Sequence, residues 1–466
     1  MATARSDYQN LSLRDRGGSR YIVNIKGRSP LPLRIHSWLR SSSASICVHL
    51  RLVFLVFHVW FPTTPMLHEV FVYDALRTPR TRGKPSGGLH VLSPVSLVIA
   101  LLTELRKRYP GIESKVDEVI LGCCEQLNDQ GGNLARSAAL AAGFPNHVPG
   151  LMVSRFCGSA LDAVNTGAAK VMAGQADLVV VGGVEMLSLF TIFGSGGPMI
   201  LDPEFKDQVP PVPQGISADL IATLQGYSRR DVDSFAAASQ QRADTAWKNG
   251  WFSRSIVPVE TGEGTVTRDE LVRENVTVDS LSKLSPSFAK LGAEGYEDLV
   301  RLRYPQVSHV NYVHHAGNSS GIADGAGIVL LGTREVGQTF NLQPRARILS
   351  TGSAGDEPCI MLTAPAEATR RALRRLDLKF SDIDLYEVNE AFASVVLYFM
   401  EKTKVPHEKV NVAGGSIAMG HPVGATGAML IGTLVDELQR RQLQRGAVTM
   451  CTGLGMGVTT ILETCP

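Results

Sequence analysis

The stretch "CGSALDAVNTGAAKVMAGQADLVVVGG" (residues 157–183) joins two different hydrophobic patterns. In its first part Leu161, Val164, Ala168 and Val171 recur at helical spacing, which predicts a helix with one buried face. In its last part "DLVVVGG" is a continuous apolar run, which predicts a strand buried on both faces. A helix that leads into such a strand is typical of α/β proteins.

The same alternation continues outward from this stretch and then repeats. "EVILG" (118–122) predicts a strand, and "GNLARSAALAAG" (132–143) predicts a helix. In the second half "DIDLYEV" is similar to "KVDEVIL", and "GAVTMC" is similar to "ADLVVVGG", each at an offset of about 265 to 270 residues. An offset of this length indicates a duplicated α/β domain and not an array of short repeats.

The chain between the two copies is more polar and irregular. Residues of about 190–321 include a charged helical stretch at 228–250, and they predict an insertion that covers a site or forms an interface. We therefore expect an N-terminal half at 66–332, which contains this insertion, and a C-terminal half at 333–466.

The first 65 residues differ in composition from the rest. They hold nine Lys/Arg and two Asp/Glu, a net charge of +7, whereas the remainder has −5. Their apolar patch at 52–61 is shorter than the ~20 residues of a membrane span. We expect that translation starts at Met66 and that residues 1–65 are an artefact of gene prediction, with an organellar transit peptide as the alternative.

The charge of the body gives no reason to expect a nucleic-acid partner. The chain ends in "ETCP", without a peroxisomal tripeptide, and the cytoplasm is the predicted location unless residues 1–65 are a genuine transit peptide.

Seven cysteines are scattered along the chain without a C-x-x-C pair, so neither a metal site nor a disulfide framework is indicated. A reducing compartment and free thiols are expected. Cys157 stands at the predicted start of a helix, whose dipole favours a thiolate. Cys451 ends a strand just before glycines that allow a tight turn with inward N–H groups.

His421 lies in "GGSIAMGHPVGATGA" (414–428), where the surrounding glycines allow a bulky ligand to approach the imidazole. Most other histidines lie in polar stretches, with "HVNYVHHAGN" (309–318) as an exception. Asn389 and Glu390 follow a buried strand, where α/β sheets usually carry their sites. Asn389 also fits a helix cap, and Glu390 is expected to be a buried structural partner. A cysteine, a histidine and a glycine-rich loop of N–H donors suffice for acyl transfer through a thioester.

Six motifs in order resemble those of the thiolases, and the resemblance covers residues of about 67 to 464. They are "VYDALRTPRTRG", "VSRFCGSALDAV" with "GGVEMLS", "HAGNSSGIADGAG", "NEAFA", "GGSIAMGHPVGATGA" and "CTGLGMG". The resemblance implies two similar halves with α-β-α-β-α layers and an inserted loop domain. It also implies coenzyme A as a co-substrate, with no permanently bound cofactor and no metal.

The resemblance also implies a role for each matching position. Cys157 would be the nucleophile that becomes acylated. His421 would take its proton and, with Asn389 acting through a water, form an oxyanion site. Cys451 would be the second acid/base. The backbone N–H groups of Cys157 and Gly453 would form the other oxyanion hole.

Five further positions match those that contact coenzyme A in the family. They are Arg273 near the adenine, Phe288, Ala316, Ser320 beside the pantetheine, and Phe392.

Two departures from the family pattern bear on turn geometry and substrate. Leu454 occupies a place that is usually glycine. Pro213 and Gln214 stand where thiolases specialised for acetoacetyl-CoA tend to carry a His-Met pair, which favours a broader 3-ketoacyl-CoA thiolase of the β-oxidation type.

The alternative is an acetyl-CoA acetyltransferase that makes acetoacetyl-CoA. Decarboxylating ketoacyl synthases are disfavoured by Cys451 beside "GLGMG", and an inactive binding protein is disfavoured by the intact catalytic positions. The resemblance further implies acyl-CoA and CoA as partners, a homodimer or homotetramer, and possible association with another β-oxidation enzyme.

Overall fold

The computed structural model describes residues 8–14, 20–26 and 67–465. The apolar patch at 52–61 and most of the N-terminal extension lie outside the described residues. Strands β1 (Tyr8–Arg14) and β2 (Arg20–Lys26) pair antiparallel in a unit separate from Leu67–Pro466. No helix within the described ranges combines the length and the hydropathy needed to cross a bilayer.

The strands of the N-terminal half lie in the order β6-β5-β7-β10-β3, with the short β4 beside β10. β5 pairs parallel with both β6 and β7, and β10 pairs antiparallel with both β7 and β3. These strands are β3 (Val70–Arg77), β4 (Thr81–Arg82), β5 (Glu118–Gly122), β6 (Gly150–Val153), β7 (Leu178–Met186) and β10 (Ala323–Gly332).

The C-terminal half repeats this arrangement with β12-β13-β14-β11. β12 pairs parallel with β13 and makes a parallel bridge to Val410, while β14 pairs antiparallel with both β13 and β11. The predicted duplication is confirmed, since β5 and β12, and likewise β7 and β13, occupy equivalent places. The strands are β11 (Ala346–Gly355), β12 (Leu385–Val388), β13 (Arg445–Thr452) and β14 (Met456–Thr464).

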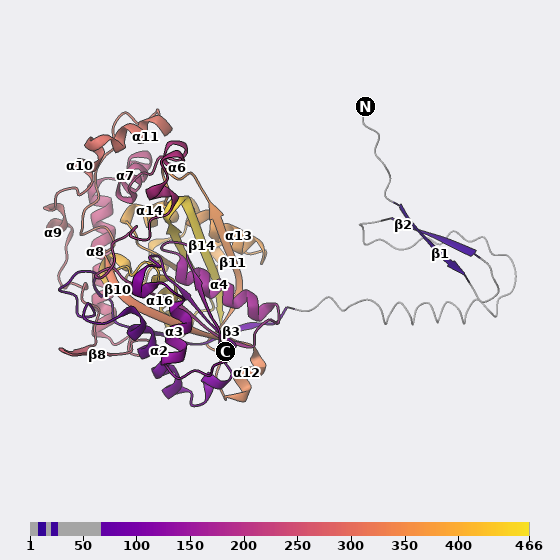
Figure 1. The fold of residues 1–466 in the computed structure, drawn as a ribbon. Helices are drawn as coiled ribbons and strands as arrows, with labels where there is room; N and C mark the ends of the chain where they lie inside the picture. The colour runs from indigo at the N-terminus through magenta and orange to yellow at the C-terminus, as the bar shows by residue number, and fades with distance from the viewer. Residues whose placement is uncertain (1–7, 15–19, 27–66, 466) are drawn as a thin grey trace, which may run out of the picture. The chain divides into compact units, whose positions relative to one another are not determined.

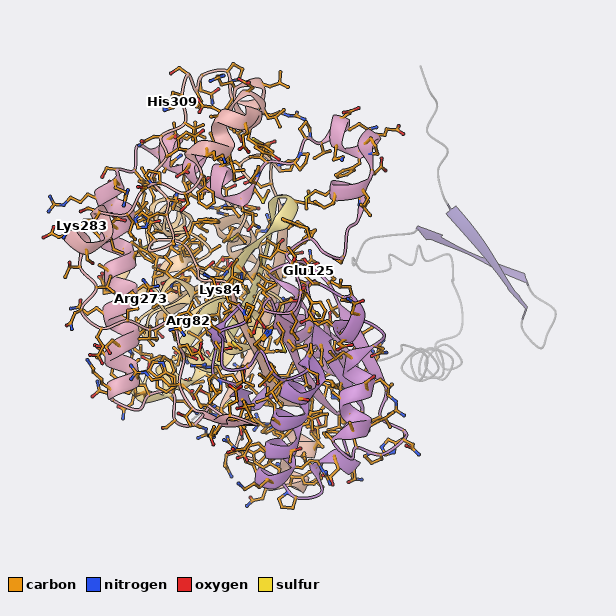
Figure 2. All side chains as sticks on the ribbon, turned by 60° about the vertical axis from the view of Figure 1, so that its left-hand side comes forward. Arg82, Lys84, Glu125, Arg273, Lys283 and His309 are labelled. Atoms are coloured by element: carbon orange, nitrogen blue, oxygen red, sulfur yellow. The ribbon has the colours of Figure 1, made fainter. Side chains whose placement is uncertain are left out.

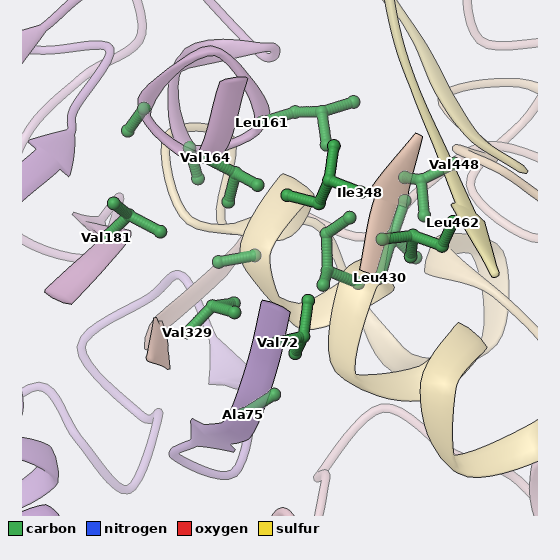
Figure 3. Close-up of a cluster of buried hydrophobic side chains, with 14 of the residues drawn as sticks. Val72, Ala75, Leu161, Val164, Val181, Val329, Ile348, Leu430, Val448 and Leu462 are labelled. Atoms are coloured by element: carbon green, nitrogen blue, oxygen red, sulfur yellow. The ribbon is translucent and has the colours of Figure 1, made fainter. Parts of the chain in front are cut away.

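Two equivalent helices, α4 (Ser159–Met172) and α16 (Thr426–Arg441), pack between the two halves. The central cluster combines side chains of both helices with side chains from strands of both halves (Figure 3). Leu161 and Val164 of α4 are fully buried there, as their helical spacing predicts, and each such side chain contributes about 1.5–3 kcal/mol. A Cβ on Gly427 would come within 2.4 Å of the Leu161 backbone nitrogen, so α4 and α16 meet at a position that requires glycine.

Other helices cover the outer faces of the strands. The N-terminal half has α2 (Pro94–Arg108) and α3 (Leu134–Ala141), and the C-terminal half has α13 (Pro365–Arg374) and α14 (Ala393–Thr403). Backbone hydrogen bonds between β3 and β11 connect the strands of the two halves. The layers are therefore α-β-α-β-α, and the expected duplicated α/β fold is confirmed.

A long excursion separates β7 from β10 and carries most of the remaining helices (Figure 1). Its most extended element is α8 (Arg229–Lys248), which begins with a capping box made by Ser228 and Asp231. The other elements are α5 (Pro198–Leu201), α6 (Pro203–Gln208), α7 (Gln214–Gln225), β8 (Val259–Thr261), β9 (Gly264–Val266), α9 (Val278–Ser282), α10 (Ala289–Leu291) and α11 (Glu297–Arg303).

Candidate active site

Cys157 and Cys451 come from different halves of the molecule and lie close together. Cys157 precedes α4, and Cys451 lies near the end of β13. A Cβ on Gly158 would come within 2.8 Å of Thr452 Cγ2, so the residues that follow the two cysteines are in contact. Burial, with a smaller contribution from the neighbouring Cys157, raises the pKa of Cys451.

Burial changes the expected state of both thiols. Cys157 and Cys451 are both buried. Burial raises the pKa of Cys157 to about 12 and raises the pKa of Cys451 as well. The helix N-terminus is expected to favour a Cys157 thiolate, whereas burial acts in the opposite direction and favours the neutral thiol.

The imidazole of His421 is buried and held in one tautomer. Thr426 Oγ1 donates to Pro422 O at 3.0 Å, so it accepts from His421 Nδ1, which lies 2.7 Å away. Nε2 is therefore the unprotonated nitrogen. Burial, with the nearby positive charge of Arg80, lowers the pKa of His421 to about 3. The imidazole is neutral at physiological pH, and its unprotonated Nε2 is free to accept a proton.

Asn389 is the side chain that faces this Nε2. Ser416 Oγ donates to Asn389 Oδ1 at 2.7 Å, which directs the amide nitrogen Nδ2 toward His421 Nε2 at 3.4 Å. Asn389 lies just after β12 and does not cap α14, whose N-cap is Phe392. The backbone N–H of Asn389 donates to Thr449 O, which brings the ends of the parallel strands β12 and β13 together.

The turn that carries His421 is tied to the loop that follows β5 by Glu185 of β7. The Glu185 carboxylate accepts from the N–H groups of Cys124 (2.8 Å) and Gly424 (2.9 Å) and from Gln130 Nε2 (2.8 Å). Burial raises the pKa of Glu185 to about 7. Glu185 thus connects the two halves beside the candidate site.

Glu390 supports the same turn from the other side. It accepts from Ser239 Oγ (2.7 Å), Asn411 Nδ2 (2.9 Å) and the Ile417 N–H (3.1 Å), and its side chain is fully buried. These contacts match the structural role expected for Glu390.

Gly453 follows Cys451 and Thr452, and its Cα lies beside the Phe156 ring. The next residue, Leu454, adopts φ 58° and ψ 31°, the left-handed conformation that glycine takes without strain. The departure at Leu454 therefore leaves the turn in the conformation that a glycine permits.

We expect Leu454→Gly to be about 1 kcal/mol more stable than Leu454→Ala, because both remove the side chain but only glycine relieves the positive φ. Urea unfolding of the two variants measures the difference. Equal stabilities would mean that the left-handed conformation carries no strain here.

Four of the five candidate CoA residues cluster next to this site. The Phe288 and Phe392 rings meet edge to face with centroids 6.0 Å apart. The Ser320 N–H donates to Ala391 O, directly before Phe392, and Ala316 lies on the same loop as Ser320. The following residue, Gly321, accepts from the His421 N–H at 2.8 Å, so this loop runs beside the imidazole.

The loop is held by His314 and His315, two of the three histidines of the 309–318 stretch. His314 Nδ1 lies 2.7 Å from Asp219 Oδ1, and His315 Nε2 lies 2.8 Å from Asp233 Oδ1, all of them buried. Arg273, the fifth candidate, is instead exposed beside α8 (Figure 2). Its backbone N–H donates to Gln240 Oε1 of that helix.

Gln214 was identified from the sequence only as a departure from a His-Met pair. It begins α7, and its side chain lies near the Cys157 thiol, where it partly offsets the rise in pKa that burial causes. The neighbouring Gly215 packs so closely on Phe288 that a Cβ would lie 2.3 Å from the ring. Gln214 and Phe288 therefore connect Cys157 to the cluster of candidate CoA residues.

Comparisons with known proteins agree with this arrangement. Residues 70–294 match the model of the thiolase N-terminal domain, and residues 342–464 match that of the thiolase C-terminal domain. The two matches cover most of the chain. The chain therefore belongs to the thiolase family, and it is an acyltransferase.

Individual relatives differ in substrate. The chain is 38% identical over 423 residues to a β-ketoadipyl-CoA thiolase of Pseudomonas aeruginosa, covering 85% of this chain and 100% of that protein. It is similar to the crystal structure of Bacillus anthracis acetyl-CoA acetyltransferase (33% identity) and to that of human mitochondrial 3-ketoacyl-CoA thiolase (30% identity). For both structures the TM-score is 0.74, and the match covers 86% of this chain and 100% of the other chain.

Proposed function

We propose that this thiolase cleaves a 3-ketoacyl-CoA with CoA and yields acetyl-CoA and an acyl-CoA shortened by two carbons. The observation that supports the proposal is the meeting of two buried thiols, one from each half, in a protein whose His421 is a buried, neutral imidazole. Claisen-type cleavage needs one group to carry the acyl chain and another to protonate the carbanion that leaves.

In the first half-reaction Cys157 Sγ attacks C3 of the substrate while its proton passes to His421 Nε2. The C2–C3 bond breaks, its electron pair stays on C2, and C2 takes the proton of the Cys451 thiol to give acetyl-CoA. The raised pKa of Cys451 suits this role, because it keeps the thiol protonated until the carbanion forms.

In the second half-reaction a CoA thiol attacks the acyl group on Cys157. Its proton passes to the Cys451 thiolate, and His421 returns its proton to the Cys157 thiolate. Asn389 with His421 would stabilise one oxyanion, through a water, and the N–H groups of Cys157 and Gly453 the other. Each such donor contributes about 3–4 kcal/mol in other acyl-transfer enzymes.

We assign the CoA contacts to Phe288, Ala316, Ser320 and Phe392, with the exposed Arg273 toward the adenine end. The loop that ends at Gly321 supports this assignment, since it runs beside His421. We also propose a homodimer or homotetramer, which light scattering would distinguish, and a degradative role of the β-oxidation type.

The substrate is tested by chain length. We expect kcat/KM for thiolysis to be at least as high for C8 to C16 3-ketoacyl-CoA as for acetoacetyl-CoA, because Gln214 replaces part of the His-Met pair of acetoacetyl-CoA specialists. Steady-state assays of a protein that begins at Met66 would measure this, with the full chain as the control. A strong preference for acetoacetyl-CoA would favour the acetyl-CoA acetyltransferase alternative, to which the similarity with the Bacillus anthracis structure also points.

A further inference from the structure

Arg80 is a buried cation with few partners. It lies between β3 and β4 and has no exposed surface. Its Nη1 donates to Gly420 O at 3.0 Å. Among the residues that the structure describes, none accepts a hydrogen bond from its Nε or Nη2. Since burying a charge is costly unless it is paired, Arg80 calls for a reason beyond packing.

The carboxylates around Arg80 leave its charge largely uncompensated. Asp269 accepts from the Arg80 backbone N–H at 2.7 Å, but its two oxygens are already paired with the Arg77 guanidinium at 2.8 and 2.9 Å. Glu387 and Glu390 also face Arg80, and burial raises the pKa of each carboxyl group. Burial lowers the pKa of Arg80 only to about 10, so the guanidinium stays charged at neutral pH.

Within the described part of the chain, the side chain of Arg80 makes one hydrogen bond, to the residue directly before His421. Gly420 has φ 97°, and its carbonyl is held by Arg80. The His421 N–H is held by Gly321, and its Nδ1 by Thr426. Arg80 therefore completes the set of contacts that fix the imidazole, and it is the charged group whose field lowers the pKa of His421.

We propose that Arg80 is a positioning residue that holds the Gly420–His421 backbone and whose charge keeps the Cys157–His421 pair neutral until a thioester binds. The proposal rests on the proposed function of Cys157 and His421. An imidazolium beside Arg80 is unfavourable, so the proton leaves Cys157 only as its bond to the acyl carbon forms. The same imidazolium readily returns its proton at the end of the second half-reaction. In the resting enzyme the thiolate is scarce, which protects Cys157 from other electrophiles.

The test is the rate at which iodoacetamide alkylates Cys157, measured by mass spectrometry of the labelled peptide from pH 5 to pH 9. Without the Arg80 charge, the thiolate–imidazolium pair becomes more stable relative to the neutral thiol–imidazole pair. We expect the alkylation rate of Arg80→Met to be about tenfold above the wild-type rate throughout this range, which corresponds to a fall of about one unit in the thiol pKa. Arg80→Lys keeps the charge and should stay near the wild-type rate.

Two further variants separate charge from packing. Arg80→Gln loses the charge but keeps a donor for Gly420 O, so it should show the same shift with a smaller loss of stability. Arg345→Met removes another buried arginine, whose partners Asp436 and Gln439 lie on α16, and should leave the alkylation profile unchanged. Glu185, whose pKa burial raises to about 7, also raises the pKa of Cys157. Because Glu185 is unchanged in all of these variants, it does not cause differences between them.

The proposal would be overturned if both Arg80→Met and Arg80→Gln were alkylated at or below the wild-type rate. It would also be overturned if the alkylation rate of Arg80→Lys rose as much as that of Arg80→Met. The measurement needs no substrate. Failure of the proposed function would instead appear as a wild-type enzyme that alkylates normally but lacks thiolysis.

Discussion

Replacement of Cys157 by serine is expected to lower kcat for thiolysis by at least about 10³-fold. A serine hydroxyl has a far higher pKa than a thiol, and the neutral, buried His421 is too weak a base to remove its proton readily. The acyl-enzyme therefore forms very slowly. Loss of [¹⁴C]acetyl transfer from acetyl-CoA to the protein, together with steady-state thiolysis, measures the effect.

The matched control is Cys465→Ser, which changes a half-buried thiol. Cys465 follows the last residue of β14, at the opposite end of this strand from the turn at Gly455. It should retain wild-type kcat. If Cys157→Ser kept full thiolysis, another residue would have to carry the acyl group, and the assignment of the nucleophile would fail.

Replacement of Cys451 by alanine is expected to lower thiolysis by about 10²- to 10⁴-fold while leaving acylation of Cys157 by acetyl-CoA intact. Cys451 is buried and, with a raised pKa, stays protonated, so it is suited to deliver a proton to C2 and to take it back. The diagnostic measurement is exchange of the acetyl-CoA methyl protons in D₂O, followed by NMR.

Cys359→Ala provides the control here, because Cys359 lies in the same apolar cluster as Cys451 and is similarly buried. It should retain both exchange and thiolysis. Proton exchange that persists at the wild-type rate in Cys451→Ala would exclude the second cysteine as the acid/base.

Local patterns predicted the layered architecture because burial leaves a periodic trace in the chain. The helical spacing of Leu161 and Val164 and the apolar run of β7 both appear in the structure at the expected places. The second copy of the pattern predicted a duplicated domain, and in the structure β12 and β13 pair parallel as β5 and β7 do. The hydrogen bonds between β3 and β11 have no such signal, since they depend on how the two halves meet.

The sequence predicted which residues form the candidate site but not their protonation states. Residue types and motif order indicated Cys157, His421, Asn389 and Cys451, but the state of each group depends on its surroundings. The fixed tautomer of His421 comes from Thr426 and Pro422, and the raised pKa of Cys157 comes from burial. The contact between Gln214 and Cys157 joins positions 57 residues apart, which the local pattern does not reveal.

Arg80 shows where sequence patterns mislead. In "RTPRTRG" it stands among other arginines, as a solvated surface charge would. In the folded chain it is buried against Gly420, some 340 residues later. By itself the sequence determined the duplicated α/β architecture and the residue types of an acyl-transfer site, because hydrophobic periodicity and turn chemistry are local. Only the tertiary structure decided which groups are charged, which nitrogen is basic and which cation faces it, because these properties depend on desolvation and on neighbours brought together by folding.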